Sequence, residues 1–342
     1  MQRSVRNCGF TIVELMIAVL LGMILTAVVS AIYIGNRQTT VTQRDLANVV
    51  QNGSFAIDVV SRLFRQAGQV AVDGLAVGTD AGGAPPNFCG SATAAPAAAS
   101  ASGTSSGGFI EGIDNDTPNG TVIAGSDTVL LRYYGSSAQK AGAAADGSIV
   151  DCFGKAIAGP ISGSGPAGRT WAKLFVETDS TTGNPALYCE YLNSGDASST
   201  KQALVDNVES FQVMYGVGAK YDAAGTTELA AGTVGNFRIQ VKKYLRAGST
   251  SNSDMTVADW NNVIAVRIGM MISGDAPNSR GALDTKTDYN LFGTGYASTN
   301  GAGFDATSAS SLAASRRSRL RQVFSTTIEL KNAPLYVGCA SS

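Results

Sequence analysis

The sequence predicts an α+β protein in which one long N-terminal helix packs on an antiparallel β-sheet head with long Gly/Ala/Ser-rich loops. Three observations predict this class. Residues 10–64 are first almost wholly apolar and then apolar at helical spacing. Residues 127–332 contain short runs rich in β-branched and aromatic residues, with turn residues between them. Charged residues make up only 15% of the chain and glycines number 40, which is typical of strands and turns rather than a helical bundle.

The first half of the expected helix is apolar enough to cross a membrane. Between Phe10 and Ile34, Glu14 is the only Asp, Glu, Lys or Arg. A helix of that length spans about 38 Å at about 1.5 Å per residue, more than a hydrocarbon core of about 30 Å. Arg3 and Arg6 precede it and favour a cytoplasmic N-terminus. We therefore predict a transmembrane helix over residues 10–35.

Two ordinary interpretations compete for this segment. One is a secretory signal cleaved near Ala31, which would release a free-standing secreted binding module. Its apolar run is about 20 residues, longer than the roughly 7–15 of a signal peptide. The other is a plain signal anchor, in which Glu14 is tolerated because it lies about 6 Å from the helix start.

A third interpretation accounts for more residues. The stretch "GFTIVELMIAVLLG" at 9–22 resembles the N-terminus of type IV prepilins and pseudopilins. The resemblance implies that a prepilin peptidase cuts between Gly9 and Phe10, removes the leader 1–9, and methylates the new amine of Phe10. It also implies a role for Glu14 in filament assembly.

The spacing from Phe10 to Glu14 has a physical reason. Four residues place the carboxylate one turn above the new amine, on the same helix face. An unpaired carboxylate in hydrocarbon is costly, so we expect it to meet an amine, its own or that of a neighbouring subunit. Pairing with a neighbour would fix the axial step between subunits. Many major pilins carry a proline in this segment, whereas residues 17–33 contain none and only Gly22 as a helix breaker.

Residues 36–66 are expected to continue the helix as an amphipathic segment. Polar residues, including Arg44 and Asp45, fill the positions between the apolar ones. The stretch "QNGS" at 51–54 is a candidate bend. Without a bend, one helix from Phe10 to about Arg65 would be about 82 Å long. The apolar positions are Val41, Leu46, Val49, Val50, Ile57, Val60, Leu63 and Phe64.

The head is expected to occupy residues 67–342 in the periplasm or outside the cell. It begins with a loose connection over 74–108. A short helix is a candidate over 311–322. Strands are predicted within 127–135, 173–178, 186–192, 204–217, 236–245, 262–273 and 321–332.

Four short sequence stretches in the predicted head point to one particular family of pilins. "LYC", "LVDNVESFQVMYG", "WNNVIAVRIGMMI" and "RQVFSTTIELKN" occur in this order and are similar to the C-terminal region of PilW-type minor pilins. That family implies a type IV pilin-like fold and a minor pilin that helps start a type IV pilus, lies at its tip and supports adhesion and twitching. It implies an inner-membrane location before assembly and the pilus tip afterwards. Implied partners are other minor pilins, the major pilin, a PilY-type tip adhesin, the prepilin peptidase and the inner-membrane platform. The alternative is a J-type minor pseudopilin of type II secretion.

Cysteine usage predicts two disulfides. Cys8 would be removed with the leader. The mature chain would then have four cysteines, all in a head that is expected to face an oxidising periplasm. Three connectivities are open. We favour Cys152–Cys189, because the pair brackets a probable hairpin, and this leaves Cys89–Cys339.

Nothing in the sequence favours catalysis, a cofactor or a metal. Histidine is absent, and no C-x-x-C pair occurs. The G-x-S-x-G match at 103–107 and the G-x-G-x-x-G match at 163–168 lie in Gly/Ser-rich sequence without the required context. Asp114 begins a run that only loosely matches a calcium loop, and a turn is the better interpretation. A net charge of −1 gives no reason to expect nucleic acid binding.

Overall fold

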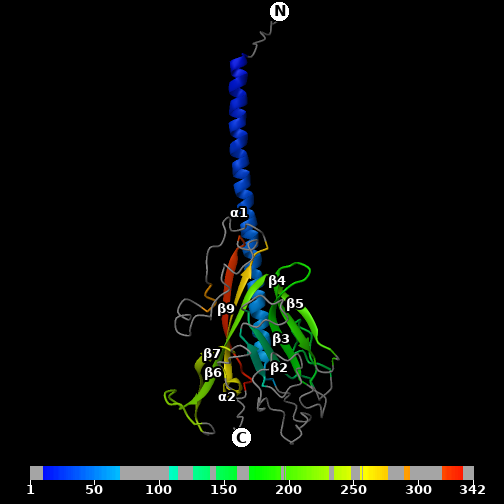
Figure 1. Ribbon diagram of the computed structural model, residues 1–342, viewed down its shortest axis with the longest axis vertical. Coiled ribbons are helices and arrows are strands. Elements are labelled where there is room, and N and C mark those ends of the chain that lie inside the picture. The colour runs from blue at the N-terminus through cyan, green and yellow to red at the C-terminus, as the bar shows by residue number, and fades with distance from the viewer. Residues whose placement is uncertain are drawn as a thin grey trace, which may run out of the picture.

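The computed structural model describes two helices and nine strands within its described residues, and it confirms the predicted α+β class. The strands follow the long N-terminal helix, and a short second helix lies before the eighth strand (Figure 1). The described residues are 11–69, 108–114, 126–138, 144–159, 169–193, 196, 198–230, 235–247, 255, 257–275, 289–292 and 318–333.

Helix α1 (Ile12–Gln66) is one uninterrupted helix of 55 residues. The bend considered at residues 51–54 is therefore wrong. Gly53 instead allows close packing, because a Cβ atom there would overlap the ring of Phe324. The helix ends where the Ala67 N–H binds carbonyls of the last turn and Gly68 takes a positive φ of 76°.

The strands form two antiparallel sheets where the sequence predicted one. The first sheet has the order β1-β2-β3-β4-β5 and the second has the order β7-β6-β8-β9. Their bounds are β1 (Ile110–Ile113), β2 (Thr128–Tyr133), β3 (Thr170–Thr178), β4 (Pro185–Leu192), β5 (Thr200–Asp206), β6 (Val208–Tyr221), β7 (Arg238–Leu245), β8 (Val263–Ser273) and β9 (Arg321–Glu329).

The division into two sheets occurs at Asn207. The run 204–217 was predicted as a single strand, but Asn207 separates β5 from β6. It has φ 60°, the only positive φ of a non-glycine residue in the described chain. Asparagine tolerates this left-handed conformation better than most residues, so the chain can leave one sheet and enter the other within one residue.

One hydrophobic core joins the helix to both sheets. Helix α1 contacts β8 and β9 of the second sheet and β2 and β5 of the first, while β6 contacts β3 and β4. In Figure 1 the C-terminal half of α1 passes through the head, and the N-terminal half extends away from it. The core shared by these elements includes Leu63, Phe64, Leu131, Leu174 and Ile268.

The head covers only one side of the amphipathic half-helix. Val49, like the apolar residues at 60, 63 and 64, is buried as predicted. Val41, Leu46 and Val50, however, are 41–43% exposed, because they face away from the sheets. Asp45 was expected among the solvent-facing polar residues, yet it is 3% exposed.

Three features of the head differ from the predictions or were missed. Strand β1 was not predicted, and neither was helix α2 (Val257–Asn261), which has only five residues. The candidate helix over 311–322 lies partly outside the described residues, and residues 318–320 of it are not helical.

Candidate functional site

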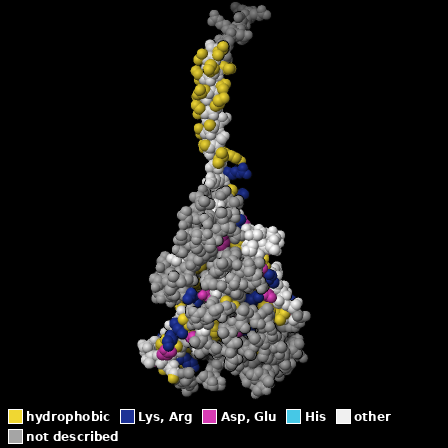
Figure 2. Space-filling model, in the orientation of Figure 1, with side chains coloured by type: hydrophobic (Ala, Val, Ile, Leu, Met, Phe, Trp, Pro, Cys, Tyr) yellow, Lys and Arg dark blue, Asp and Glu magenta, His cyan; other side chains and the backbone are white. Residues whose placement is uncertain are grey.

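The N-terminal half of α1 is an apolar rod without cover from the rest of the described chain. Residues 15–36 contain no Asp, Glu, Lys or Arg, so Glu14 and Arg37 bracket a span of about 33 Å at about 1.5 Å per residue. Every large hydrophobic side chain from Ile12 to Ile34 is at least 49% exposed. Figure 2 shows these side chains along the half-helix, which stands clear of the head. The segment is long and apolar enough to cross a membrane.

The helix start is built around Thr11 and Glu14. Thr11 is the N-cap, with extended backbone, and its side-chain oxygen accepts a hydrogen bond of 3.3 Å from the Glu14 N–H. The Glu14 side chain is exposed and forms no salt bridge with any described residue. Gly9 and Phe10 lie outside the described residues, so the cleavage site, the methylated amine and its pairing with Glu14 stay predictions.

Four threonine hydroxyl groups between Thr26 and Thr42 of α1 are satisfied within the helix. Thr26 donates to the carbonyl oxygens of Gly22 and Met23 at 3.0 and 2.9 Å. Three further threonines, Thr39, Thr40 and Thr42, donate to the carbonyl four residues earlier at 2.9–3.0 Å. In an apolar environment an unsatisfied hydroxyl costs free energy, so this pairing suits a helix that enters lipid or a bundle of other helices.

Polar contacts fix the other half of α1 to the junction of the two sheets. The buried Asp45 carboxylate accepts a 2.9 Å hydrogen bond from the backbone N–H of Asp275. The Asp275 side chain in turn accepts a bond from the Asn207 side chain at 2.5 Å. Beside this junction, Glu209 and Arg321 form a fully buried ion pair with contacts of 2.6 and 3.3 Å. Because both charges are satisfied, the pair links β6 to β9 with defined geometry.

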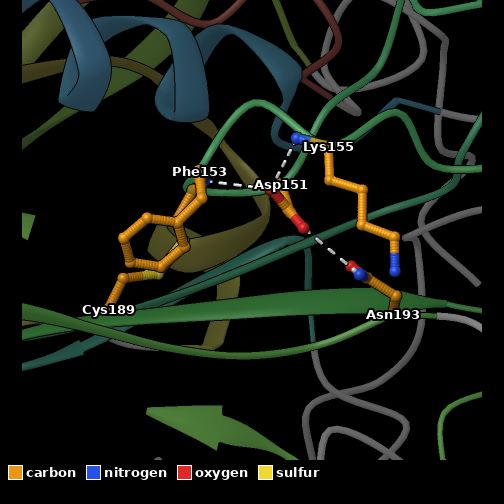
Figure 3. The surroundings of a disulfide bond; sticks show 6 residues. Asp151, Phe153, Lys155, Cys189 and Asn193 are labelled. Atoms are coloured by element: carbon orange, nitrogen blue, oxygen red, sulfur yellow. Dashed lines mark hydrogen bonds between the residues drawn. A yellow bond between two sulfur atoms is a disulfide. The ribbon is translucent and has the colours of Figure 1, made fainter. Parts of the chain in front are cut away.

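A disulfide lies within the hydrophobic core of the head. The structure joins Cys152 to Cys189 of β4, the pair favoured from the sequence, with Cα atoms 6.5 Å apart. Cys152 lies in a tight turn that is stabilised by hydrogen bonds to the fully buried Asp151 (Figure 3). The Asp151 carboxylate accepts three hydrogen bonds, from the backbone N–H groups of Phe153 and Lys155 at 2.9 Å and from the Asn193 side chain at 3.4 Å.

The remaining sequence-predicted sites fall mostly outside the described residues. Cys89 and Cys339 lie outside the described residues, so their pairing stays a prediction. The two glycine-rich motifs at 103–107 and 163–168 also lie outside the described residues. Asp114, the described member of the loose calcium-loop match, is 3.7 Å from Arg246 in an ion pair.

Sequence reasoning missed the buried polar contacts of the head. Asp45 carried no signal, because an aspartate in an amphipathic helix is normally solvated. The Glu209–Arg321 pair joins residues 112 positions apart in the chain, so no local sequence pattern predicts it.

Two family models match the chain. The model described as a prokaryotic N-terminal methylation motif matches residues 5–30. The model described as type IV pilus-assembly protein W matches residues 173–332, from within β3 to just beyond β9.

Among solved structures, a type IV-like pilin from Thermus thermophilus is similar at 12% sequence identity and a TM-score of 0.26. The match covers 66% of this chain and 85% of that one. No curated protein matches the sequence. Since the superposition is weak, the assignment rests on the family models and on the architecture.

The methylation motif, the bare apolar half-helix and the antiparallel head define the class as type IV pilin-like proteins anchored through an N-terminal helix. Within this class, the two family matches support a PilW-type pilin with a prepilin N-terminal motif.

Proposed function

We propose that this pilin is a minor pilin that helps initiate type IV pilus assembly, forms part of the tip complex, and thereby supports adhesion and twitching motility. The observation that carries the proposal is the uncovered apolar half of α1 with Glu14 at its start. So large an apolar surface is unfavourable in water and requires lipid or other helices around it. The proposed role is structural and non-enzymatic.

The two environments of this half-helix correspond to two stages. Before assembly it spans the inner membrane, with the head in the periplasm. After extraction, helices of other minor pilins and of the major pilin replace the lipid. The Glu14 carboxylate then finds its cation in an N-terminal amine of a subunit in the filament. Further proposed partners are a PilY-type tip adhesin, the prepilin peptidase and the inner-membrane platform.

Substitution of Glu14 tests the role of the carboxylate. Glu14→Ala and Glu14→Gln are expected to fold, insert and be cleaved, because the side chain makes no contact with the head and Gly9 is intact. Incorporation should fail in both, since neither alanine nor glutamine carries the negative charge needed for an ion pair with an amine. The measurement is complementation of a deletion strain, with counts of surface pili and immunoblots of membrane levels.

Arg37→Gln serves as the matched control, because it removes a charge at the other end of the same apolar span. This variant should restore piliation. Normal piliation by Glu14→Ala at equal abundance would contradict the proposed assembly role.

The second candidate is a J-type minor pseudopilin of type II secretion, which has the same N-terminal motif. The match to the pilus-assembly family over residues 173–332 favours the pilus. A deletion that abolished protein secretion but left surface pili and twitching intact would instead support the secretion system.

A further inference from the structure

A pocket of about 330 Å³, lined mostly by residues with polar or charged side chains, lies at the C-terminal end of α1. This end is about 48 Å beyond Ile34 along the helix, at about 1.5 Å per residue, so the pocket is well clear of the membrane-spanning half. Its lining residues come from α1, from the residues just after it, and from two distant segments of the chain. They are Asp58, Arg62, Arg65, Gln66, Gln69, Ser148, Ile149 and Asn332.

The two arginines are not needed to complete the helix. Arginines near a helix C-terminus often pair with its last carbonyl groups. Here the four last carbonyls already accept other hydrogen bonds. The donors are the Ala67 N–H to Leu63 and Phe64, the Asn332 side chain to Arg65, and the Gln69 N–H to Gln66, at 3.0–3.2 Å.

Arg62 and Arg65 are also exposed and form no salt bridge with any described residue. Asp58, one turn before Arg62, is the only acidic residue among the described residues of the pocket lining. The described lining thus carries two positive charges against one negative charge.

The pocket has a second, independent indication of a missing acceptor. Gln66 is 7% exposed, and its side-chain oxygen accepts a 2.7 Å hydrogen bond from the Val150 N–H. Its side-chain nitrogen has no hydrogen-bond partner among the described residues. A buried amide donor is normally paired, and leaving it unpaired costs about 1–3 kcal/mol in the usual range. An acceptor group entering beside Gln66 would remove this cost.

We propose that this pocket binds the carboxylate of an acidic segment of a protein partner. Arg62 and Arg65 supply charged donors at the rim, and the Gln66 amide supplies a neutral donor at the base. Ile149 offers an apolar wall for the aliphatic part of a glutamate side chain, and Asp58 favours a ligand that also brings an N–H group, as a peptide does. The volume is at the lower end for ligand pockets, about 300–1,000 Å³, and suits one or two side chains.

The test uses the full mature chain in detergent micelles and two capped peptides, acetyl-Gly-Glu-Glu-Gly-amide and its Gln-Gln counterpart. Binding is followed by NMR titration into the millimolar range, with inorganic phosphate as a third probe. We expect the Glu peptide to bind and the Gln peptide not to bind. Arg62→Gln/Arg65→Gln should weaken binding about tenfold or more, since it removes two charge-assisted donors.

Arg37→Gln/Arg44→Gln is the matched control. It removes the same charge from exposed positions of the same helix and should change the affinity less than about twofold. The same thermal unfolding midpoint in both double variants would show that the head is intact. The proposal is overturned if the Glu peptide does not bind, or if it binds equally to the two double variants. Equal binding of the Gln peptide overturns the carboxylate, and phosphate binding as tightly as the Glu peptide overturns the protein partner in favour of a simple anion.

Discussion

At the scale of single residues, Gly53 shows how a position that looks like a helix defect sets the packing of the head. Glycine in a helix interior normally costs about 1 kcal/mol relative to alanine. Here the absent side chain lets the Phe324 ring of β9 lie directly against the helix backbone. The contact brings helix and sheet closer than any other residue would permit.

Gly53→Ala is therefore expected to destabilise the protein in spite of its better helix propensity. Overpacking against Phe324 should cost about 1–3 kcal/mol, which exceeds or cancels the propensity gain. The measurement is chemical unfolding of the mature protein in micelles, followed by circular dichroism. Gly35→Ala is the control, because nothing lies within 4 Å of its new Cβ atom, and it should be neutral or stabilising. Stabilisation by Gly53→Ala would contradict this account of the packing.

A second effect at residue scale concerns the turn between β3 and β4. The Asp179 carboxylate accepts bonds from the backbone N–H of Thr182 at 2.7 Å and of Thr181 at 3.0 Å. It also accepts one from the Tyr188 hydroxyl at 2.7 Å. These hydrogen bonds lower the pKa of Asp179 to about 2. The bond from the Thr182 N–H has the largest effect, followed by the bond from the Tyr188 hydroxyl. Burial and the bond to Asp179 raise the pKa of Tyr188 to about 12.

These pKa shifts predict a stability that falls at both pH extremes. The Asp179 pKa is lower in the folded state, so its contribution is present above about pH 4 and is lost as pH falls towards 2. The Tyr188 pKa is higher in the folded state, so its contribution is present below about pH 10 and is lost as pH rises towards 12. Thermal unfolding midpoints between pH 2 and 6 should fall less steeply in Asp179→Asn than in the wild type. Asp206→Asn, at an exposed carboxyl, should follow the wild-type slope, and identical slopes in all three would refute the assignment.

At the scale of elements, long periodic segments were predictable because their signal is local. The helix and seven of the nine strands follow from apolar spacing and β-branched content. Strand β1 has four residues and helix α2 has five, too short for a period to emerge. The separation of β5 from β6 depends on one backbone angle at Asn207, which the surrounding apolar pattern conceals.

The candidate sites were likewise predictable only where their residues are close together in the sequence. The apolar span and its single Glu14 are contiguous, so the sequence alone identifies them. The pocket beside Arg62 and Gln66 combines residues up to 274 positions apart in the chain, Asp58 and Asn332 being the extremes. Which residues converge there depends on the fold, and no spacing rule reports it.

The Cys152–Cys189 disulfide connects a tight turn to β4 across a sequence separation of 37 residues. Its removal by Cys152→Ala/Cys189→Ala is expected to lower the free energy of unfolding by about 4 kcal/mol, because the unfolded chain loses a constraint on a loop of this length. Denaturant unfolding of the oxidised proteins measures the change. The same substitutions at Cys89 and Cys339 give the comparison, and a non-reducing peptide map tests that second predicted pair. A loss below about 1 kcal/mol would show that the bond contributes little.

At the scale of the whole molecule, the protein divides into the exposed, apolar first half of α1, which no described part of the head covers, and a head that packs around the rest of α1. All residues from 12 to 41 are exposed, and Asp45 is the first buried residue of the helix. The contacts that stabilise the head should therefore begin near Asp45. The two halves of one continuous helix are suited to different surroundings. The first half suits lipid or the helices of other pilins, and the second half packs on the sheets of its own head.

A pair of truncations tests this division. A chain that begins at Arg37 should be soluble without detergent and should unfold within about 2 °C of the full chain, because it keeps every buried residue of α1. A chain that begins at Gly53 lacks Asp45 and Val49. It leaves the Asp275 N–H without its acceptor and removes apolar cover from the sheets, so its midpoint should fall by about 5 °C or more. Light scattering after size-exclusion chromatography and thermal circular dichroism measure both properties. If the chain beginning at Arg37 aggregated or unfolded as early as the shorter one, the first half of α1 would have to stabilise the head, contrary to its complete exposure.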